Sequence, residues 1–201
     1  MKQFLMIAVA AAALATPALA QDNRGRTYGE EAEGWYDLNA DVQSFCKFGT
    51  QNSAGAAVNA TVVAGAPGST AEADGTFMLD IQDPNDDTIR PARGRYDIAY
   101  AVCNSPFDMT LTSQNGGLKN DATTSDDEFT SLVLYGVDFN FDGIESSTYP
   151  MPAGVHTVES SLEARAGSAR IRVNVRASDN LLLQGVYADR LTAALVPNLG
   201  G

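Results

Sequence analysis

Residues 133–141 read VLYGVDFNF, and this stretch decides the fold class. Its apolar side chains fall on every second position, and the turn-forming pair Asp142-Gly143 follows at once. A two-residue period places the apolar side chains on one face of an extended chain, whereas a helix needs a period of about 3.6. The stretch therefore predicts a long β-strand with one buried face, ended by a turn.

The same alternation recurs along most of the chain, in segments bounded by Gly, Pro, Asn and Asp. Residues 160–169 are the nearest candidate for a helix, but they carry only a weak helical stripe. Residues 52–76, rich in Ala, Gly and Ser, show no clear pattern. We predict an all-β protein, an antiparallel β-sandwich. The other alternating segments are 77–81, 96–102, 107–111, 171–175 and 187–195.

Composition narrows the classes of function. The chain of 201 residues has 13 Lys+Arg, 25 Asp+Glu, one His and two Cys, with a formal net charge of -12. An excess of acids argues against binding to nucleic acid or an anionic membrane, because phosphates need basic side chains to neutralise them. One His and two Cys are too few for a four-ligand zinc site, and a haem or iron–sulfur cluster is equally disfavoured. We expect no cofactor.

The first residues predict export. Lys2 is followed by an apolar run over residues 4–15 and by Ala18-Leu19-Ala20, the small-x-small pattern of a signal-peptide cleavage site. We therefore interpret residues 1–20 as a signal peptide, residues 21–34 as a flexible polar leader and residues 35–201 as the folded domain. The protein is therefore expected to be exported from the cytoplasm.

Export also bears on Cys46 and Cys103. A pair of cysteines in an oxidising compartment predicts a disulfide bond between them. A reactive thiol is the competing interpretation, since Lys47 lies beside Cys46 and a basic neighbour favours the thiolate. The even number of cysteines favours the disulfide.

No pattern indicates catalysis. The single His156 stands near no serine in a sharp turn, and we interpret it as a solvated surface residue. We predict that the protein is not an enzyme.

Residues 138–143, DFNFDG, resemble the opening of a calcium loop, with Asp138, Asn140 and Asp142 as candidate metal ligands. The twelfth position of such a loop should be a bidentate Glu, but here it is Tyr149. A hairpin turn with Asp-Gly at its tip is the favoured interpretation.

Arg170, Arg172 and Arg176 alternate with apolar residues, so this strand has one cationic face. We interpret the row as the wet face of an exposed strand that keeps a sheet edge soluble. Contact with an anionic glycan is the second interpretation.

The order and spacing of several motifs resemble the spore coat protein U domain, from which subunits of archaic chaperone–usher pili are built. The most specific piece is the closing segment 185–195, GVYADRLTAAL, with Gly, Tyr and Asp on alternate positions before an alternating strand. The other matching pieces are residues 36–42 before Cys46, Phe48-Gly49, a strand that ends at Cys103, residues 107–111 followed by 115–118, and residues 133–135.

The resemblance implies an immunoglobulin-like sandwich that lacks one strand, with a hydrophobic groove beside its last strand. A periplasmic chaperone would fill the groove, and a sibling subunit delivered to an outer-membrane usher would then donate a strand to it. Residues 35–43 would be the donor, and the closing segment would line the groove. The donor side chains would be Tyr36, Leu38, Ala40 and Val42, and those of the groove Tyr187, Leu191, Ala193 and Leu195.

The resemblance therefore implies a non-catalytic subunit of a pilus or other surface fibre, which would pass through the periplasm to the cell surface or the outside of the cell. The alternation at 36–42 equally suits the first strand of a complete sandwich. The alternative function is therefore a self-contained, monomeric secreted β-sandwich that coats a surface or binds a ligand.

Overall fold

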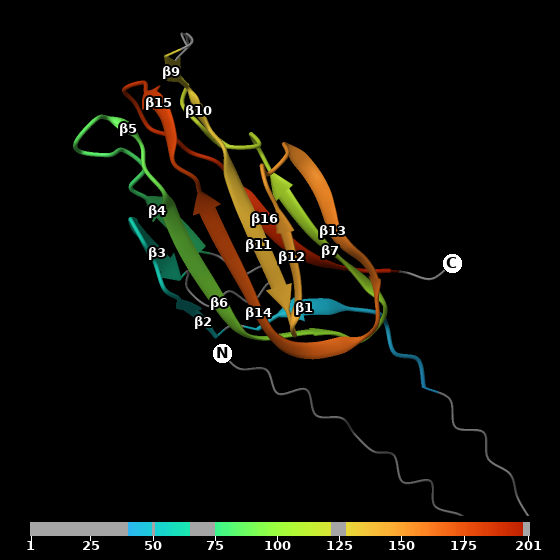
Figure 1. Ribbon diagram of the computed structural model, residues 1–201. Coiled ribbons are helices and arrows are strands. Elements are labelled where there is room, and N and C mark those ends of the chain that lie inside the picture. Colours follow the sequence, from blue (N-terminus) through green and yellow to red (C-terminus); the bar gives the residue numbers. More distant parts are fainter. Residues whose placement is uncertain (1–39, 50, 65–74, 122–127, 199–201) are drawn as a thin grey trace, which may run out of the picture. The chain divides into compact units, whose positions relative to one another are not determined.

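The computed structural model describes residues 40–49, 51–64, 75–121 and 128–198 (Figure 1). The chain divides into two units, Met1–Ala40 and Asp41–Gly201, and the strands described below all belong to the second. The predicted signal peptide, the polar leader, Tyr36 and Leu38 lie outside the described residues.

The described residues form an all-β structure without a helix, arranged as a β-sandwich, as the alternation predicts. All strand pairs of the larger sheet are antiparallel, and the long strands β6 and β14 are neighbours within it (Figure 1). Its strands, in spatial order, are β1 (Cys46–Phe48), β6 (Ala92–Cys103), β14 (Arg165–Val175), β11 (Tyr135–Phe141) and β12 (Ile144–Thr148), and β2 (Asn52–Ala54) also pairs with β6.

The second sheet of the sandwich has three antiparallel strands. These are β13 (Gly154–Leu162), β7 (Phe107–Ser113) and β16 (Leu191–Pro197), with β7 in the middle.

Short strands make three smaller sheets. β3 (Ala60–Ala64) and β4 (Gly75–Leu79) form a pair, as do β8 (Leu118–Lys119) and β10 (Leu132–Val133). The third holds β5 (Thr88–Ile89), β15 (Ser178–Leu182) and β9 (Phe129–Thr130), and its β15–β9 pair is parallel. The strands β2, β3 and β4 fall in or beside the segment 52–76 that shows no clear sequence pattern.

The stretch 133–141 behaves as predicted. In β11 the side chains of Val137, Phe139 and Phe141 are fully buried, and the polar residues between them lie on the opposite face. Phe141 meets Phe107 of the second sheet edge-on, with the ring centroids 5.5 Å apart. Aromatic contacts of this kind join the inner faces of the two sheets into one core.

A tight hairpin follows β11. Asp142 and Gly143 have φ values of 48° and 83°, and β12 returns antiparallel to β11. Two consecutive positive φ values are typical of the two-residue turn that matches the twist of a hairpin. The favoured interpretation of residues 138–143 is therefore confirmed.

Residues 160–169 form no helix; they make the end of β13 and the start of β14. The stripe there is too weak to form a helix, as expected, and the chain instead pairs with β7 and β6. Within the described ranges, no helix is long and apolar enough to cross a membrane.

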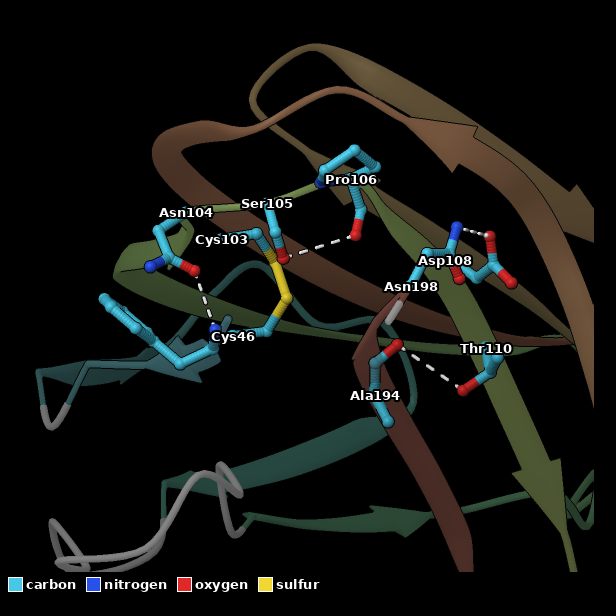
Figure 2. Close-up of a disulfide and its surroundings, with 10 residues drawn as sticks. Cys46, Cys103, Asn104, Ser105, Pro106, Asp108, Thr110, Ala194 and Asn198 are labelled. Atoms are coloured by element: carbon cyan, nitrogen blue, oxygen red, sulfur yellow. Dashed lines mark hydrogen bonds between the residues drawn. A yellow bond between two sulfur atoms is a disulfide. The ribbon is translucent and has the colours of Figure 1, made fainter. Parts of the chain in front are cut away.

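The predicted disulfide between Cys46 and Cys103 is confirmed (Figure 2). The two residues lie opposite each other where β1 pairs with β6, with their Cα atoms 4.1 Å apart. Beside the bond, the main-chain N–H of Phe45 donates to the side-chain oxygen of Asn104 at 2.7 Å. The bond therefore fixes the first strand of the described chain to the end of β6.

Replacing both cysteines by alanine is expected to lower the free energy of unfolding by about 2–4 kcal/mol, since the bond closes a long loop in the unfolded chain. Urea unfolding with and without a reductant measures the effect. The reductant should lower the midpoint of the natural protein and leave the double variant unchanged. An equal response of the two proteins would contradict the structural role of the bond.

Candidate strand-acceptor edge

β16 is an edge strand. Within the described residues it pairs with β7 alone, in a continuous register from Leu191 opposite Ser113 to Pro197 opposite Phe107. One side of β16 is therefore hydrogen-bonded to β7. No strand in the described part of the chain is hydrogen-bonded to the other side, although β1 of the larger sheet lies close to β16.

The hydrogen bonds at the two ends of this pair tell which groups point outward. Gln114 N–H donates to Arg190 C=O at 3.0 Å, and Asn198 N–H donates to Pro106 C=O at 2.7 Å. In an antiparallel ladder the residues alternate between those that bond to the partner strand and those that face away from it. The main-chain groups of Leu191, Ala193 and Leu195 therefore face the open side of β16.

The side chains of the same three residues turn toward the core. Leu195 is 9% exposed, and Leu191 and Ala193 are partly buried against the core. Pro197 occupies the next outward position and has no N–H to offer, so it ends the run of available donors. The open side of β16, which we call the acceptor edge, thus combines apolar side chains with main-chain groups that have no hydrogen-bond partner among the described residues.

Tyr187, the fourth predicted groove residue, precedes β16 and lines a cleft of about 660 Å³. Its hydroxyl donates to the main-chain oxygen of Thr130 at 2.6 Å, which fixes the ring in the cleft wall. The apolar side chains of the cleft come from β4, β8, β15 and the approach to β16. They are Phe77, Met78, Leu79, Ile81, Leu118, Leu182, Leu183 and Tyr187.

A carboxylate anchors the start of β16. Asp189 accepts hydrogen bonds from the hydroxyls of Ser113 and Tyr135 and from the main-chain N–H of Asn115, the last at 2.9 Å. The Ser113 hydroxyl in turn accepts the N–H of Gly116 at 2.8 Å. This network, which we call the Asp189 anchor, ties the approach to β16 to the ends of β7 and β11.

Gly185 explains the first position of the closing motif. Its φ of 148° is a conformation that favours glycine, and a Cβ atom there would lie 2.6 Å from the side-chain nitrogen of Asn120. The three alternate residues of the motif thus have separate structural roles. Gly185 allows the side chain of Asn120 to approach the main chain, Tyr187 forms part of the cleft wall, and Asp189 is the hydrogen-bond acceptor of the anchor.

A second carboxylate anchors the far end of β16. Asp108 accepts the side-chain N–H of Asn198 at 3.0 Å (Figure 2) and the main-chain N–H of Ser161 at 2.8 Å. These two hydrogen bonds, that from Asn198 first, hold the pKa of the Asp108 carboxyl below its usual 3.8. Thr110 adds a longer contact of 3.5 Å from its hydroxyl to the Ala194 carbonyl.

The predicted donor residues are described only in part. Ala40 and Val42 are exposed, Val42 to 74%, and neither belongs to a strand. Tyr36 and Leu38 lie outside the described residues. The structure therefore does not bring the described donor residues together with the acceptor edge.

The other candidate residues do not converge. Asp138 accepts bonds from Ser147, Arg172 and Asn174, whereas Asp142 at the turn lies 3.8 Å from Arg165. No group of three or more His, Cys, Asp or Glu side chains in the described ranges could hold a metal ion. His156 is half-buried on β13, opposite Leu111, and is less exposed than the sequence interpretation has it.

Comparisons with protein-family models, with curated proteins and with solved structures return no match to this chain.

The Asp189 anchor is open to a direct test. Asp189→Ala leaves the Ser113 and Tyr135 hydroxyls without their acceptor, and we expect it to lower the free energy of unfolding by about 2–4 kcal/mol. Asp179→Ala removes an exposed carboxylate from β15 and should cost less than about 0.5 kcal/mol. Urea unfolding compares the two variants, and equal losses would contradict the anchor.

The environment of Tyr135 leads us to expect a lower free energy of unfolding at alkaline pH. Burial raises the pKa of its phenol above the ordinary 10.0, and the hydrogen bond to Asp189 raises it further. The folded protein holds this proton more tightly than the unfolded chain. Its contribution is therefore complete below about pH 10, and the free energy of unfolding falls as the pH rises beyond that value.

Unfolding of the natural protein and of Tyr135→Phe in urea, from about pH 8 to about pH 11, measures this contribution. The phenylalanine variant should be less stable at the lower pH but lose less stability on the way up. Parallel pH profiles would show that Tyr135 is not the source.

Proposed function

We propose that this protein is a non-catalytic structural subunit of a surface fibre, assembled when residues 35–43 of one copy pair with the acceptor edge of another. It would be related to the spore coat protein U domain, exported, and served by a periplasmic chaperone and an outer-membrane usher. The observation that carries the proposal is the acceptor edge itself.

The two outer edges of the smaller sheet differ, and the difference supports the proposal. At the β13 edge, the Ser146 hydroxyl of β12 donates to the carbonyl of Val158 at 3.1 Å, so the two sheets touch there. At the β16 edge, the outward groups of Leu191, Ala193 and Leu195 have no hydrogen-bond partner among the described residues. An unprotected strand edge is a ready template for another chain.

The geometry of the acceptor edge suits a donor with a two-residue period. A strand laid along β16 would bond to three outward residues at about 1 kcal/mol for each hydrogen bond. Its apolar side chains would lie beside those of Leu191, Ala193 and Leu195 on the same face. Burying Tyr36, Leu38 and Val42 would contribute about 2 kcal/mol each.

The described end of the donor segment is available to a second copy. Val42 is largely exposed, and residues 40–45 pair with no strand. Cys46, immediately beyond, is held by its disulfide. A donor segment joined to a fixed point of this kind can leave its own sandwich without disturbing the fold behind it.

A pair of single substitutions tests strand donation. Leu38→Arg places a charge on the apolar face of the donor, whereas Asn39→Arg places the same charge one position on, where the alternation points it outward. Electrophoresis of unheated samples in detergent should show a ladder of species for the natural protein and for Asn39→Arg, and a monomer for Leu38→Arg. Gel filtration should agree.

Deletion of residues 35–43 should also give a monomer, with no free thiol on titration because Cys46 and Cys103 stay bonded. A ladder that survives the deletion would contradict the donor assignment. A single monomeric species of the natural protein in both measurements would favour the alternative, a self-contained sandwich that coats a surface or binds a ligand.

A further inference from the structure

The outer face of the larger sheet carries two neighbouring rows of arginine side chains. β6 and β14 run side by side (Figure 1), so the arginines of β6 form a second row beside those of β14. Arg172 lies opposite Arg95 in the register, and Asn174 lies opposite Arg93. We call the set the arginine face: Arg93, Arg95, Arg170, Arg172 and Arg176.

The two rows stand on a rigid support. β6 and β14 are central neighbours, and the residues that alternate with the arginines are buried in the core, among them Tyr96 at 2% and Val173 at 4% exposed. Adjacent strands lie about 4.8 Å apart, and side chains on one face of a strand repeat at about 6.7 Å. The guanidinium groups therefore project from regularly spaced positions on the sheet. β14 is not an edge strand, so the idea that its arginines protect a sheet edge is wrong.

The positive charge of the face exceeds its negative charge. Asp97 is shared by Arg95 at 2.9 Å and Arg170 at 3.0 Å, and Asp138 pairs with Arg172 at 3.2 Å. These carboxylates hold three of the five guanidinium groups in place. Glu145 of β12, opposite Asn140, adds a further acid to this face, and Asp142 at the end of β11 lies 3.8 Å from Arg165.

Two arginines make no ion pair with a described carboxylate. Arg93 donates to the neutral side-chain oxygen of Asn174 at 2.8 Å. The guanidinium of Arg176 stacks on the exposed ring of Tyr149, 3.6 Å from its centroid. Tyr149 in turn lies over Gly136, where a Cβ atom would meet the ring at 2.9 Å. Both guanidinium groups keep N–H donors for an incoming anion.

We propose that the arginine face binds a linear acidic polysaccharide, through carboxylate or sulfate groups that repeat along the polymer. A guanidinium group offers a planar fork of donors that matches either anion. A second copy of this chain fits less well, because no described strand carries more than one acidic side chain and thus none presents a row of carboxylates. This inference does not rest on strand donation.

Equilibrium binding of the purified protein to immobilised polygalacturonate and to dextran sulfate tests the proposal, with neutral dextran as the reference. The natural protein should bind at least one of the two charged polymers, more weakly as salt is added. Arg93→Gln/Arg176→Gln should raise the Kd by about tenfold or more, since each arginine forms charge-assisted hydrogen bonds. Preference for one polymer assigns the anion as carboxylate or sulfate.

The matched control is Lys119→Gln/Arg190→Gln, which removes the same charge from exposed positions outside the face. Its Kd should stay within about twofold of that of the natural protein. The single variants Arg93→Gln and Arg176→Gln, each checked by thermal melting, should weaken binding by roughly threefold.

Three results would overturn the proposal: binding to neither charged polymer above neutral dextran, an equal loss in the control variant, or equally tight binding to single-stranded DNA.

Discussion

The carboxylate of Asp189 is the constraint on which the position of β16 depends. It gathers two hydroxyls and a main-chain N–H from the ends of β7 and β11. Asp189 is half-buried, whereas the Ser113 and Tyr135 side chains that donate to it are buried and would be left unsatisfied without it. β16 therefore begins at a defined point and takes a defined register on β7. Asp108 fixes its other end, so that β16 is held without a hydrogen-bonded strand on its open side among the described residues.

An open edge of this kind needs an explanation, because proteins usually protect their edge strands with charged side chains, bulges or covering segments. The run from Leu191 to Leu195 contains no charged residue, and Pro197 protects only its end. The opposite edge of the same sheet is in contact with β12. β1 likewise lies close to β16, so the two edges differ in their hydrogen bonds and not in whether the larger sheet is near. A strand donated by another copy would account for this difference, since it would satisfy the main-chain groups and cover the apolar side chains together.

The sequence predicts those features of the fold that are encoded within a single strand. β6, β7, β11, β14 and β16 each place alternate residues in the core, and their two-residue period is visible in the residues alone. β3 is missed because small residues in and around it blur that period, and β4 is predicted only in its second half, from Phe77. β13 is missed because its register with β7 shifts twice. The partners of Asp189 lie 74 and 76 residues away at Asn115 and Ser113. Pairing over such distances depends on topology and leaves no signal in the local sequence. For the same reason, the sequence does not show that the arginines of β6 lie beside those of β14.

The acceptor edge and the arginine face belong to different sheets, and this separation matters for how the two proposals combine. A strand that pairs with β16 extends the smaller sheet, whereas the arginine side chains stand on the outer face of the larger one. Assembly through β16 would therefore leave each arginine face accessible and repeat it along the fibre. Weak contacts that are individually sensitive to salt become strong when many are linked, because each later contact forms at a high effective concentration. A face with only two unpaired guanidinium groups per copy is then sufficient for firm attachment to a long polyanion.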